Sequence, residues 1–269
     1  MEQSTLRTLN DSGFPLQIAV HRCIDETRSK HGWRVKYSEH AWIDHRDKKS
    51  GFLDLVLQNA YGTSYLAVEC KRPRDTEWVF LHSEGEIKDR AHAQGWVSYY
   101  TGGSMPRFGW SQLELDPTCA EAQFCAVRGQ TAGERITLIE KTAAELTLAT
   151  ECLALEHKDY RHPTIDDLKM FFSVIVTTAK LTVAKFDPAA ISLQDGTLSN
   201  AKFENVPYVR FRKQLGVHHS VFTPEQYAAG GDLAYLKEST VFIVNAEAIC
   251  SFLEAFEVRP SSLYLQSAA

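Results

Sequence analysis

Two neighbouring segments limit what this chain can fold into more than any other feature. They are residues 51–60, GFLDLVLQNA, and residues 65–71, YLAVECK, and only the short turn YGTS separates them. Both are rich in strand-forming residues and Pro73 stops the second, so we expect neighbouring strands of one sheet. Side chains alternate between the faces of a strand, which gives each strand one wholly apolar face for a core. That face consists of Leu53, Leu55, Leu57, Leu66, Val68 and Cys70.

The opposite faces of these two strands carry charge. Asp54 lies on the first, and Glu69 and Lys71 lie on the second. On neighbouring strands the three side chains converge, and removing two carboxylates from water is costly unless a cation compensates. Hard oxygen ligands suit Mg²⁺, which keeps several waters and binds phosphate oxygens, and the Cys70 carbonyl can add a further oxygen. The pattern therefore indicates a magnesium site, at which Mn²⁺ can substitute, with Lys71 beside an attacking water or a scissile phosphate.

This arrangement resembles the PD-(D/E)xK phosphodiesterase superfamily, the restriction-endonuclease-like nucleases. The family pattern is an acidic residue at a strand end, a variable gap, and then acidic-x-Lys on the next strand. Here Asp54 is followed by fourteen residues and then by Glu69-Cys70-Lys71, and the expected flanking helices also fit the family's core order. Leu53 stands where the family usually has Pro. The resemblance covers roughly residues 16–130.

The resemblance implies a metal-dependent nuclease that hydrolyses phosphodiester bonds, with DNA favoured over RNA by family analogy. Asp54, Glu69 and the Cys70 carbonyl would hold the metal. Lys71 would position or activate water and stabilise the developing charge.

The resemblance also indicates residues around this centre. Family members often place a glutamate on the first helix, where this chain has Glu26 as a further metal ligand. Many carry a polar residue on the helix after the lysine strand, where this chain has Gln94 as a catalytic candidate. Arg72 and Arg74 directly follow the acidic strand and could hold substrate phosphates.

The rest of the chain predicts further helices and strands. Helices are expected at 15–32, around 87–100, at 134–157 and at 246–257, and strands at 33–43, 123–129, 170–186 (two strands or one hairpin), 207–215 and 239–245. This order indicates an α/β fold with a restriction-endonuclease-like mixed central β-sheet flanked by helices, and with additional C-terminal strands and a helix. We expect a nuclease-like core over residues 1–158 and a C-terminal extension over 159–269 that packs on or completes the same domain.

Each assignment has a structural alternative. Asp54, Glu69 and Lys71 could form a surface salt-bridge network on an edge pair of strands. Glu26 could pair with a basic residue one helical turn away, which is the alternative we favour for it. A nucleic-acid-binding or assembly module of the same fold, whose site no longer cuts, is the alternative to the enzyme.

The composition limits which partners and which cell compartment we expect for this protein. The formal charge of −5 excludes a globally basic nucleic-acid binder but not a local basic patch. Arg210 and Arg212 could form such a patch, although an ordinary exposed strand face is the simpler expectation. No apolar run reaches the roughly 20 residues that span a bilayer, and the first residues are unlike a secretory signal. Six scattered cysteines without a C-x-x-C pair indicate reduced core thiols and a cytoplasmic protein.

The acidic net charge also indicates that the enzyme does not bind nucleic acid broadly by itself. We expect this chain to act as a homo-oligomer or as a subunit of a larger protein complex, in which the other subunits supply much of the binding to the substrate. A role in bacterial antiviral defence, restriction or repair fits such a nuclease.

Overall fold

The computed structural model describes residues 2–73, 77–84, 90–128, 138–162, 165–215 and 238–259. The helices in these ranges are α1 (Glu2–Asp11), α2 (Phe14–His31), α3 (Leu138–Asp159) and α6 (Ile249–Ala255). The strands are β1 (Arg34–Asp44), β2 (Lys49–Gln58), β3 (Ser64–Lys71), β4 (Glu77–Ser83), β5 (Arg90–Thr101), β6 (Ser104–Cys119), β7 (Glu121–Ala122), β8 (Phe124–Val127), β9 (Asp167–Thr177), β10 (Lys180–Phe186), β11 (Lys202–Asn205), β12 (Tyr208–Lys213), β13 (Ser239–Asn245) and β14 (Glu257–Val258).

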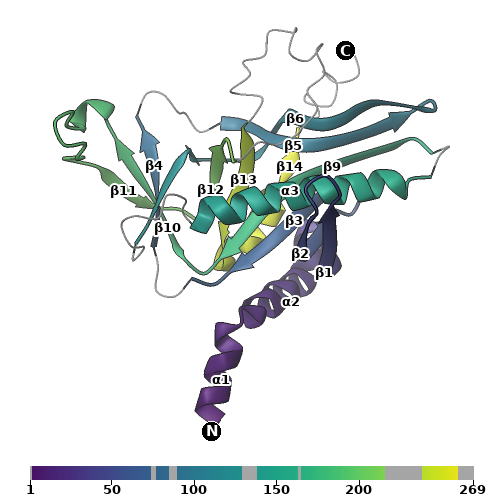
Figure 1. Cartoon of the computed structure of the whole chain (residues 1–269), viewed down its shortest axis with the longest axis horizontal. Coiled ribbons are helices and arrows are strands. Elements are labelled where there is room, and N and C mark those ends of the chain that lie inside the picture. The colour runs from purple at the N-terminus through teal and green to yellow at the C-terminus, as the bar shows by residue number, and fades with distance from the viewer. Residues whose placement is uncertain are drawn as a thin grey trace.

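The described strands form one large mixed sheet and one smaller sheet (Figure 1). The large sheet has the main order β1-β2-β3-β9-β13-β12-β7, with the β5–β6 hairpin attached to β9. The smaller sheet has the order β11-β10-β4-β8. This arrangement is a mixed α/β fold whose central sheet is flanked by helices, which confirms the general class expected from the sequence.

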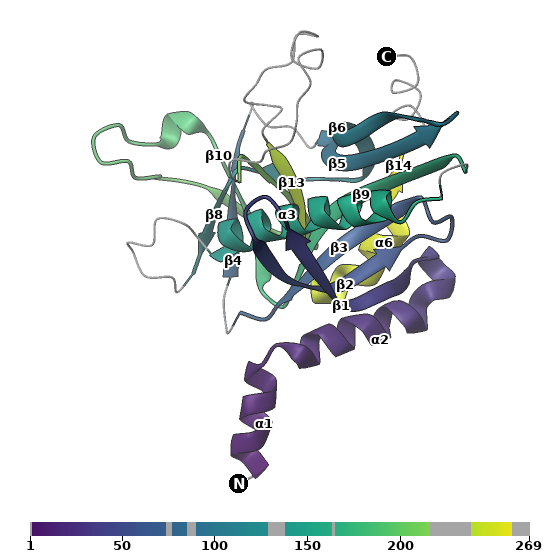
Figure 2. The ribbon, with the colours of Figure 1, turned by 45° about the vertical axis from the view of Figure 1, so that its right-hand side comes forward.

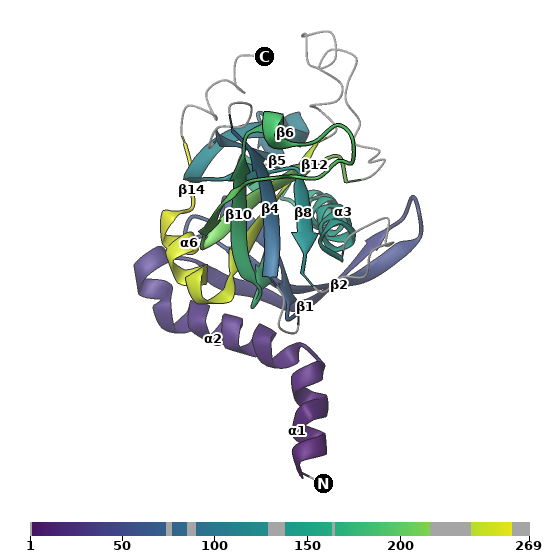
Figure 3. The ribbon, with the colours of Figure 1, turned by 90° about the vertical axis from the view of Figure 1, so that its left-hand side faces the viewer.

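Both faces of the large sheet are buried, each under different helices. Helix α3 packs against β1, β3, β5 and β9 on one face, whereas α2 and α6 pack together on the other (Figure 2). Two separate hydrophobic clusters follow from this layering, one on each face of the sheet. Helix α1, whose described side chains are exposed, extends away from both sheets (Figure 3).

The first predicted helix and the three strands after it are confirmed. Helix α2 follows Gly13, carries Pro15 in its first turn, and ends at Gly32, whose φ of 73° is left-handed and whose N–H donates to the Arg28 carbonyl at 2.8 Å. Strands β1, β2 and β3 then run antiparallel to one another in sequence order. This part of the chain folds as local pattern and turn signals predict.

The alternation expected for the second of these strands is wrong at one residue. Leu55 packs in the cluster beneath α2 and α6, but Leu53 packs with Val56 in the cluster beneath α3. Strict alternation would put Leu53 and Leu55 on the same face. The strand therefore departs from a regular pleat around Asp54.

The helix expected around residues 87–100 is wrong, because this segment contains β5, which forms a long hairpin with β6. Ala93 and Val97 lie in the cluster beneath α2, whereas Trp96 lies in the cluster beneath α3, so the apolar residues serve both faces of a sheet. Gly95 permits this packing: a Cβ at that position would lie 2.5 Å from Cε1 of Phe172. The apolar spacing looked helical because both faces of this strand are buried.

Residues 170–186 form two strands in different sheets and not a hairpin. Strand β9 pairs in parallel with β3 and with β13 in the large sheet, and β10 pairs with β4 and β11 in the smaller one. Strand β9 thus lies directly beside the strand that carries Glu69. Strands from both the N-terminal and the C-terminal halves of the chain make up the large sheet.

The expected exposed face of Arg210 and Arg212 is also wrong, since both side chains are fully buried. The Arg210 guanidinium donates to the carbonyls of His92, Leu115 and Pro117 at 2.7–3.0 Å. Arg212 donates to Glu238 at 2.6 Å. Their role is to satisfy buried acceptors, which leaves them inaccessible to a nucleic-acid backbone.

The six cysteines are free, as expected. Four are buried and two, Cys23 and Cys250, are half-buried with their Sγ atoms 2.9 Å apart. Among the described helices, none has the length and apolar character needed to cross a membrane.

We predict that Gly95→Ala lowers the free energy of unfolding by about 1–3 kcal/mol, because the new methyl group would force the buried Phe172 ring to move. Denaturant unfolding measures this change. Adding Phe172→Leu in the Gly95→Ala background should recover part of the loss, since the smaller side chain makes room. A Gly95→Ala protein as stable as the parent would show that the contact is not tight.

Candidate functional site

The candidate site lies where strands β2 and β3 stop pairing. Their ladder runs from Gln58↔Tyr65 to Leu55↔Val68, and β3 continues beyond it to Lys71. At this point Oδ2 of Asp54 accepts the backbone N–H of Cys70 at 2.6 Å. The carboxylate thus takes the place of the next strand partner and is held between the two strands.

The Cys70 carbonyl faces the same gap. In an extended strand the N–H and C=O of one residue point to the same edge, and the Cys70 N–H points to Asp54. The Cys70 thiol lies on the face covered by α2 and α6, where burial raises the pKa of the thiol well above its usual value. The side chain is therefore core, and only the backbone of this residue contributes to the site.

Glu69 and Lys71 project together on the face covered by α3. Lys71 Nζ lies 2.6 Å from Glu69 Oε1, and the two side chains are 35% and 20% exposed. Glu69 lines a cavity of about 480 Å³ whose other walls come from β2 and from the start of α3, including Phe52, Thr142 and Glu145. The acidic-x-Lys pair is thus partly open to solvent, and Glu69 faces the cavity. Because a solvent-exposed ion pair contributes little to stability, folding alone does not explain this pair.

The surroundings of Asp54 raise the pKa of its carboxyl group. Burial and the negative charge of Glu69 raise the pKa of its carboxyl from 3.8 to about 6, although the Cys70 N–H and the charge of Lys71 oppose this shift. Glu39 adds a smaller effect in the same direction as Glu69. Burial and the two neighbouring carboxylates therefore make the ionised form of Asp54 costly. A bound cation would lower this cost.

Lys71 stays charged despite its partial burial. Burial alone would lower the pKa of its ammonium, but the hydrogen bond and charge of Glu69, with the charges of Asp54 and Glu145, raise it overall. The site therefore combines the positive charge of Lys71 with a carboxyl group, that of Asp54, whose pKa is raised.

Two residues of the site, Gln17 and Glu39, were missed from the sequence. Gln17 of α2 donates from Nε2 to Glu39 Oε1 at 2.6 Å and to the Asp54 carbonyl at 2.9 Å. Glu39 has a left-handed φ of 50° and lies between the Ser38↔Leu55 and His40↔Leu53 pairs, opposite Asp54. The available signal was a glutamine among the apolar residues on the buried stripe of α2. The strained backbone at Glu39 could not be read from sequence.

The other predicted site residues do not join this cluster. Glu26 lies on the exposed side of α2, 2.7 Å from Arg22, so the alternative of a helical ion pair is confirmed. Gln94 is buried on β5, not on a helix; its backbone N–H donates to Thr240 Oγ1 at 3.0 Å, and β9 separates its strand from β3. Arg72 donates to the Asn10 carbonyl of α1. Arg74 lies outside the described residues.

The oxygen donors of the site are of the hard type that Mg²⁺ prefers. Among the described residues, no group of three or more His, Cys, Asp or Glu side chains could hold a metal ion. A dedicated protein cage is thus absent from that part of the chain. Mg²⁺ commonly takes only one or two carboxylates, with waters and substrate oxygens completing its shell. Asp54, Glu69 and the Cys70 carbonyl are such a hard-oxygen set.

Comparisons of the chain with protein-family models, with curated proteins and with solved structures found no match. The geometry and charge of the site are therefore the basis for assigning a function.

We predict that Asp54→Asn stabilises the protein at pH 8 and that this gain shrinks toward pH 4. A carboxyl whose pKa is raised from 3.8 to about 6 on folding contributes most stability below pH 3.8 and loses it as pH rises through 6. Allowing for solvent screening and a weaker acceptor for the Cys70 N–H, we expect a gain of about 1 kcal/mol at pH 8. Denaturant unfolding of both proteins across this pH range measures the difference. A difference independent of pH, or of opposite sign, would contradict the electrostatic account.

Proposed function

We propose that this protein is a magnesium-dependent nuclease that hydrolyses phosphodiester bonds, with DNA as its expected substrate. The observation that supports this proposal best is the position of the Asp54 carboxylate, held against the Cys70 backbone between Glu69 and Lys71 at the open end of two strands. In a structural salt bridge the positive partner lowers the pKa of the carboxyl group, whereas the pKa of the half-buried Asp54 is raised to about 6.

The order of elements gives further support to the resemblance with the PD-(D/E)xK superfamily. Helix α2 precedes the β1–β2–β3 meander, the acid lies on β2, the acidic-x-Lys lies on β3, and helix α3 follows. Strands β4 to β8 intervene before α3, so the helix after the lysine strand comes later in the chain than residues 87–100. A restriction-endonuclease-like core of this kind, enlarged by the insertion, is our proposal for the fold.

In this proposal Asp54, Glu69 and the Cys70 carbonyl hold the metal. When bound, Mg²⁺ would lower the pKa of a coordinated water and neutralise charge on the phosphorus. Lys71 supplies a charge that needs no metal: its ammonium can orient the attacking water or donate to a phosphate oxygen. Glu69 is the main cause of the raised pKa of that ammonium, and the charges of Asp54 and then Glu145 add to it.

Gln17 and Glu39 act as positioning residues. Gln17 ties α2 to the backbone of Asp54 and to the Glu39 carboxylate, so it fixes the place where β2 departs from its ladder. Gln94 and Glu26 have no role in the reaction in this proposal. Arg72 stays a proposed phosphate contact, because its side chain is exposed and its guanidinium, which donates to the Asn10 carbonyl, can turn to an anion.

We further propose that the enzyme acts in the cytoplasm as a homo-oligomer or as a subunit of a bacterial defence, restriction or repair complex. The net charge of −5 supports an assembly with other subunits, since an acidic chain attracts a polyanion only where basic residues are locally concentrated.

We predict metal-dependent cutting of plasmid, linear or single-stranded nucleic acid by the purified chain in Mg²⁺ or Mn²⁺, and none in EDTA. Glu69→Gln and Lys71→Met should each lower the rate by about 100-fold or more, because each removes charge at the reacting centre. Glu26→Gln is the matched control: it makes the same chemical change at an exposed carboxylate and should leave the rate unchanged. Cutting that survives in EDTA or in Glu69→Gln would contradict the assignment. Binding without cutting would favour the silent module.

We also predict that Mg²⁺ stabilises the folded protein through Asp54. At a Mg²⁺ concentration about tenfold above Kd the gain should be ~1.4 kcal/mol, seen as a higher Tm in calorimetry. The gain should be lost in Asp54→Asn and retained in Glu26→Gln. An equal Mg²⁺ effect on Asp54→Asn would place the metal elsewhere.

A further inference from the structure

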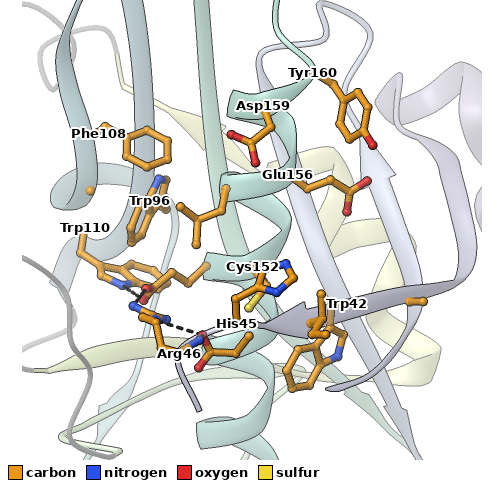
Figure 4. A pocket seen from close by; sticks show the side chains of 16 residues that line it. Trp42, His45, Arg46, Trp96, Phe108, Trp110, Cys152, Glu156, Asp159 and Tyr160 are labelled. Carbon is orange, nitrogen blue, oxygen red and sulfur yellow. Dashed lines mark hydrogen bonds and ion pairs between the residues drawn. The ribbon is translucent and has the colours of Figure 1, made fainter. Parts of the chain in front are cut away.

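A second cavity, of about 690 Å³, lies beside the candidate active site (Figure 4). Its walls are the end of β1, the β5–β6 hairpin and the C-terminal half of α3. It shares only Trp42, Asp44 and Arg46 with the cavity that Glu69 lines, so these residues separate the two spaces. Its volume lies in the range of small-molecule sites. We call it the aromatic pocket, for the side chains of Trp42, Trp96, Phe108, Trp110 and Tyr160 that line it.

Three rings of the β5–β6 hairpin form one wall, in which Trp96 is set edge to face against the other two. Trp96 meets Phe108 at a centroid distance of 5.1 Å and Trp110 at 5.5 Å, each with an interplanar angle of 82°. Rings set edge to face turn their electron-rich faces in different directions, which is the geometry of a cage for a cation. An ammonium already uses this wall: Lys158 Nζ lies 4.7 Å from the Phe108 centroid.

The floor of the pocket carries a buried net negative charge. Arg46 binds Asp44 at 2.9 Å and Glu151 at 2.6 Å, and the side chains of both acids are only 3% exposed. Two carboxylates share one guanidinium, and Asp44 Oδ1 also accepts the Arg46 backbone N–H at 3.1 Å, so the triad carries a formal charge of −1. The Trp110 indole N–H, 3.4 Å from Glu151 Oε2, offers a dipole but no charge. A negative charge at the floor of a pocket attracts a cation that enters it.

The rim continues this charge pattern. Glu156 and Asp159 also line the pocket from the C-terminal end of α3, and the exposed ring of Tyr160 lies beyond them (Figure 4). Glu156 is engaged by His40 at 2.9 Å. A phosphate or a free carboxylate would be repelled by this lining, and a neutral apolar ligand would leave the floor charge unmet.

We propose that the aromatic pocket binds an organic cation, an ammonium group that is alkylated or carried on an apolar stem, with its charge between the ring faces and the Arg46–Glu151 floor. This assignment does not depend on the nuclease activity. Two sources share the chemistry: a free quaternary ammonium such as choline, and a methylated lysine side chain of another protein.

The test follows the indole N–H resonances of the five tryptophans by NMR while the full chain is titrated. Choline and a trimethyl-lysine peptide should shift the resonances of Trp42, Trp96 and Trp110. Trp33, which packs against Phe256 on the other face of the sheet, and Trp78, in the smaller sheet, are internal controls that should not move. The tighter of the two ligands identifies the source.

Dimethylbutanol, the uncharged carbon isostere of choline, should bind at least about tenfold more weakly than choline. Equal shifts with this isostere, shifts with nucleosides but not with cations, or no shift in any titration would overturn the proposal.

Trp110→Ala should weaken choline binding by about tenfold, whereas Trp110→Phe retains most of it and Trp33→Phe, a matched change outside the pocket, retains all of it. Tyr160→Ala is a second variant, since a side chain that is 87% exposed cannot be needed for folding. It should weaken binding several-fold through loss of the rim. Unchanged affinity in both Trp110→Ala and Tyr160→Ala would place the cation elsewhere.

Discussion

The hydrogen bond from the Cys70 N–H to the Asp54 carboxylate, at the point where β2 and β3 stop pairing, is the constraint on which the site depends. A buried N–H without a partner costs as much as a lost hydrogen bond, so the end of this ladder requires an acceptor. Using a carboxylate for that purpose places a charge next to Glu69 and near Glu39, which raises the pKa of Asp54. A residue chosen only for stability would have been neutral. Lys71 offsets only part of this cost, and we take the remainder as support for the proposed function.

Helix α3 connects the candidate active site to the aromatic pocket. Near its beginning Thr142 and Glu145 line the cavity of Glu69, and one face of its second half lines the aromatic pocket. Arg46, whose side chain is 36% exposed and forms an ion pair with the buried Glu151 of this helix, lies between the two spaces. A rigid helix packed over the sheet therefore holds both sites in fixed relation, and a ligand in one cavity would contact residues that also border the other.

Local sequence determined the part of the fold around the acids. Alternating apolar residues, a short turn and Pro73 were enough to predict β2 and β3, and Pro15 with Gly32 bounded α2, because these signals act within a few residues of one another. The same pattern brought Asp54, Glu69 and Lys71 together in prediction, since a period of two assigns each side chain to a face. What these residues do chemically stays a proposal, supported by their spacing and their electrostatics.

Only the tertiary structure decided the features that depend on partners distant in the chain. Gln94 lies on a strand and not a helix because both faces of β5 are buried, and Arg210 is buried because three carbonyls from β5 and β6 surround its guanidinium. Gln17 reaches Asp54 only once α2 has packed on the sheet, and Glu39, with its left-handed backbone, lies opposite Asp54 only once β1 has paired with β2. Periodicity records which side chains share a face, but it holds no information on which far segment covers that face. The sequence by itself therefore determined the strands and their acids, and tertiary packing decided what surrounds them.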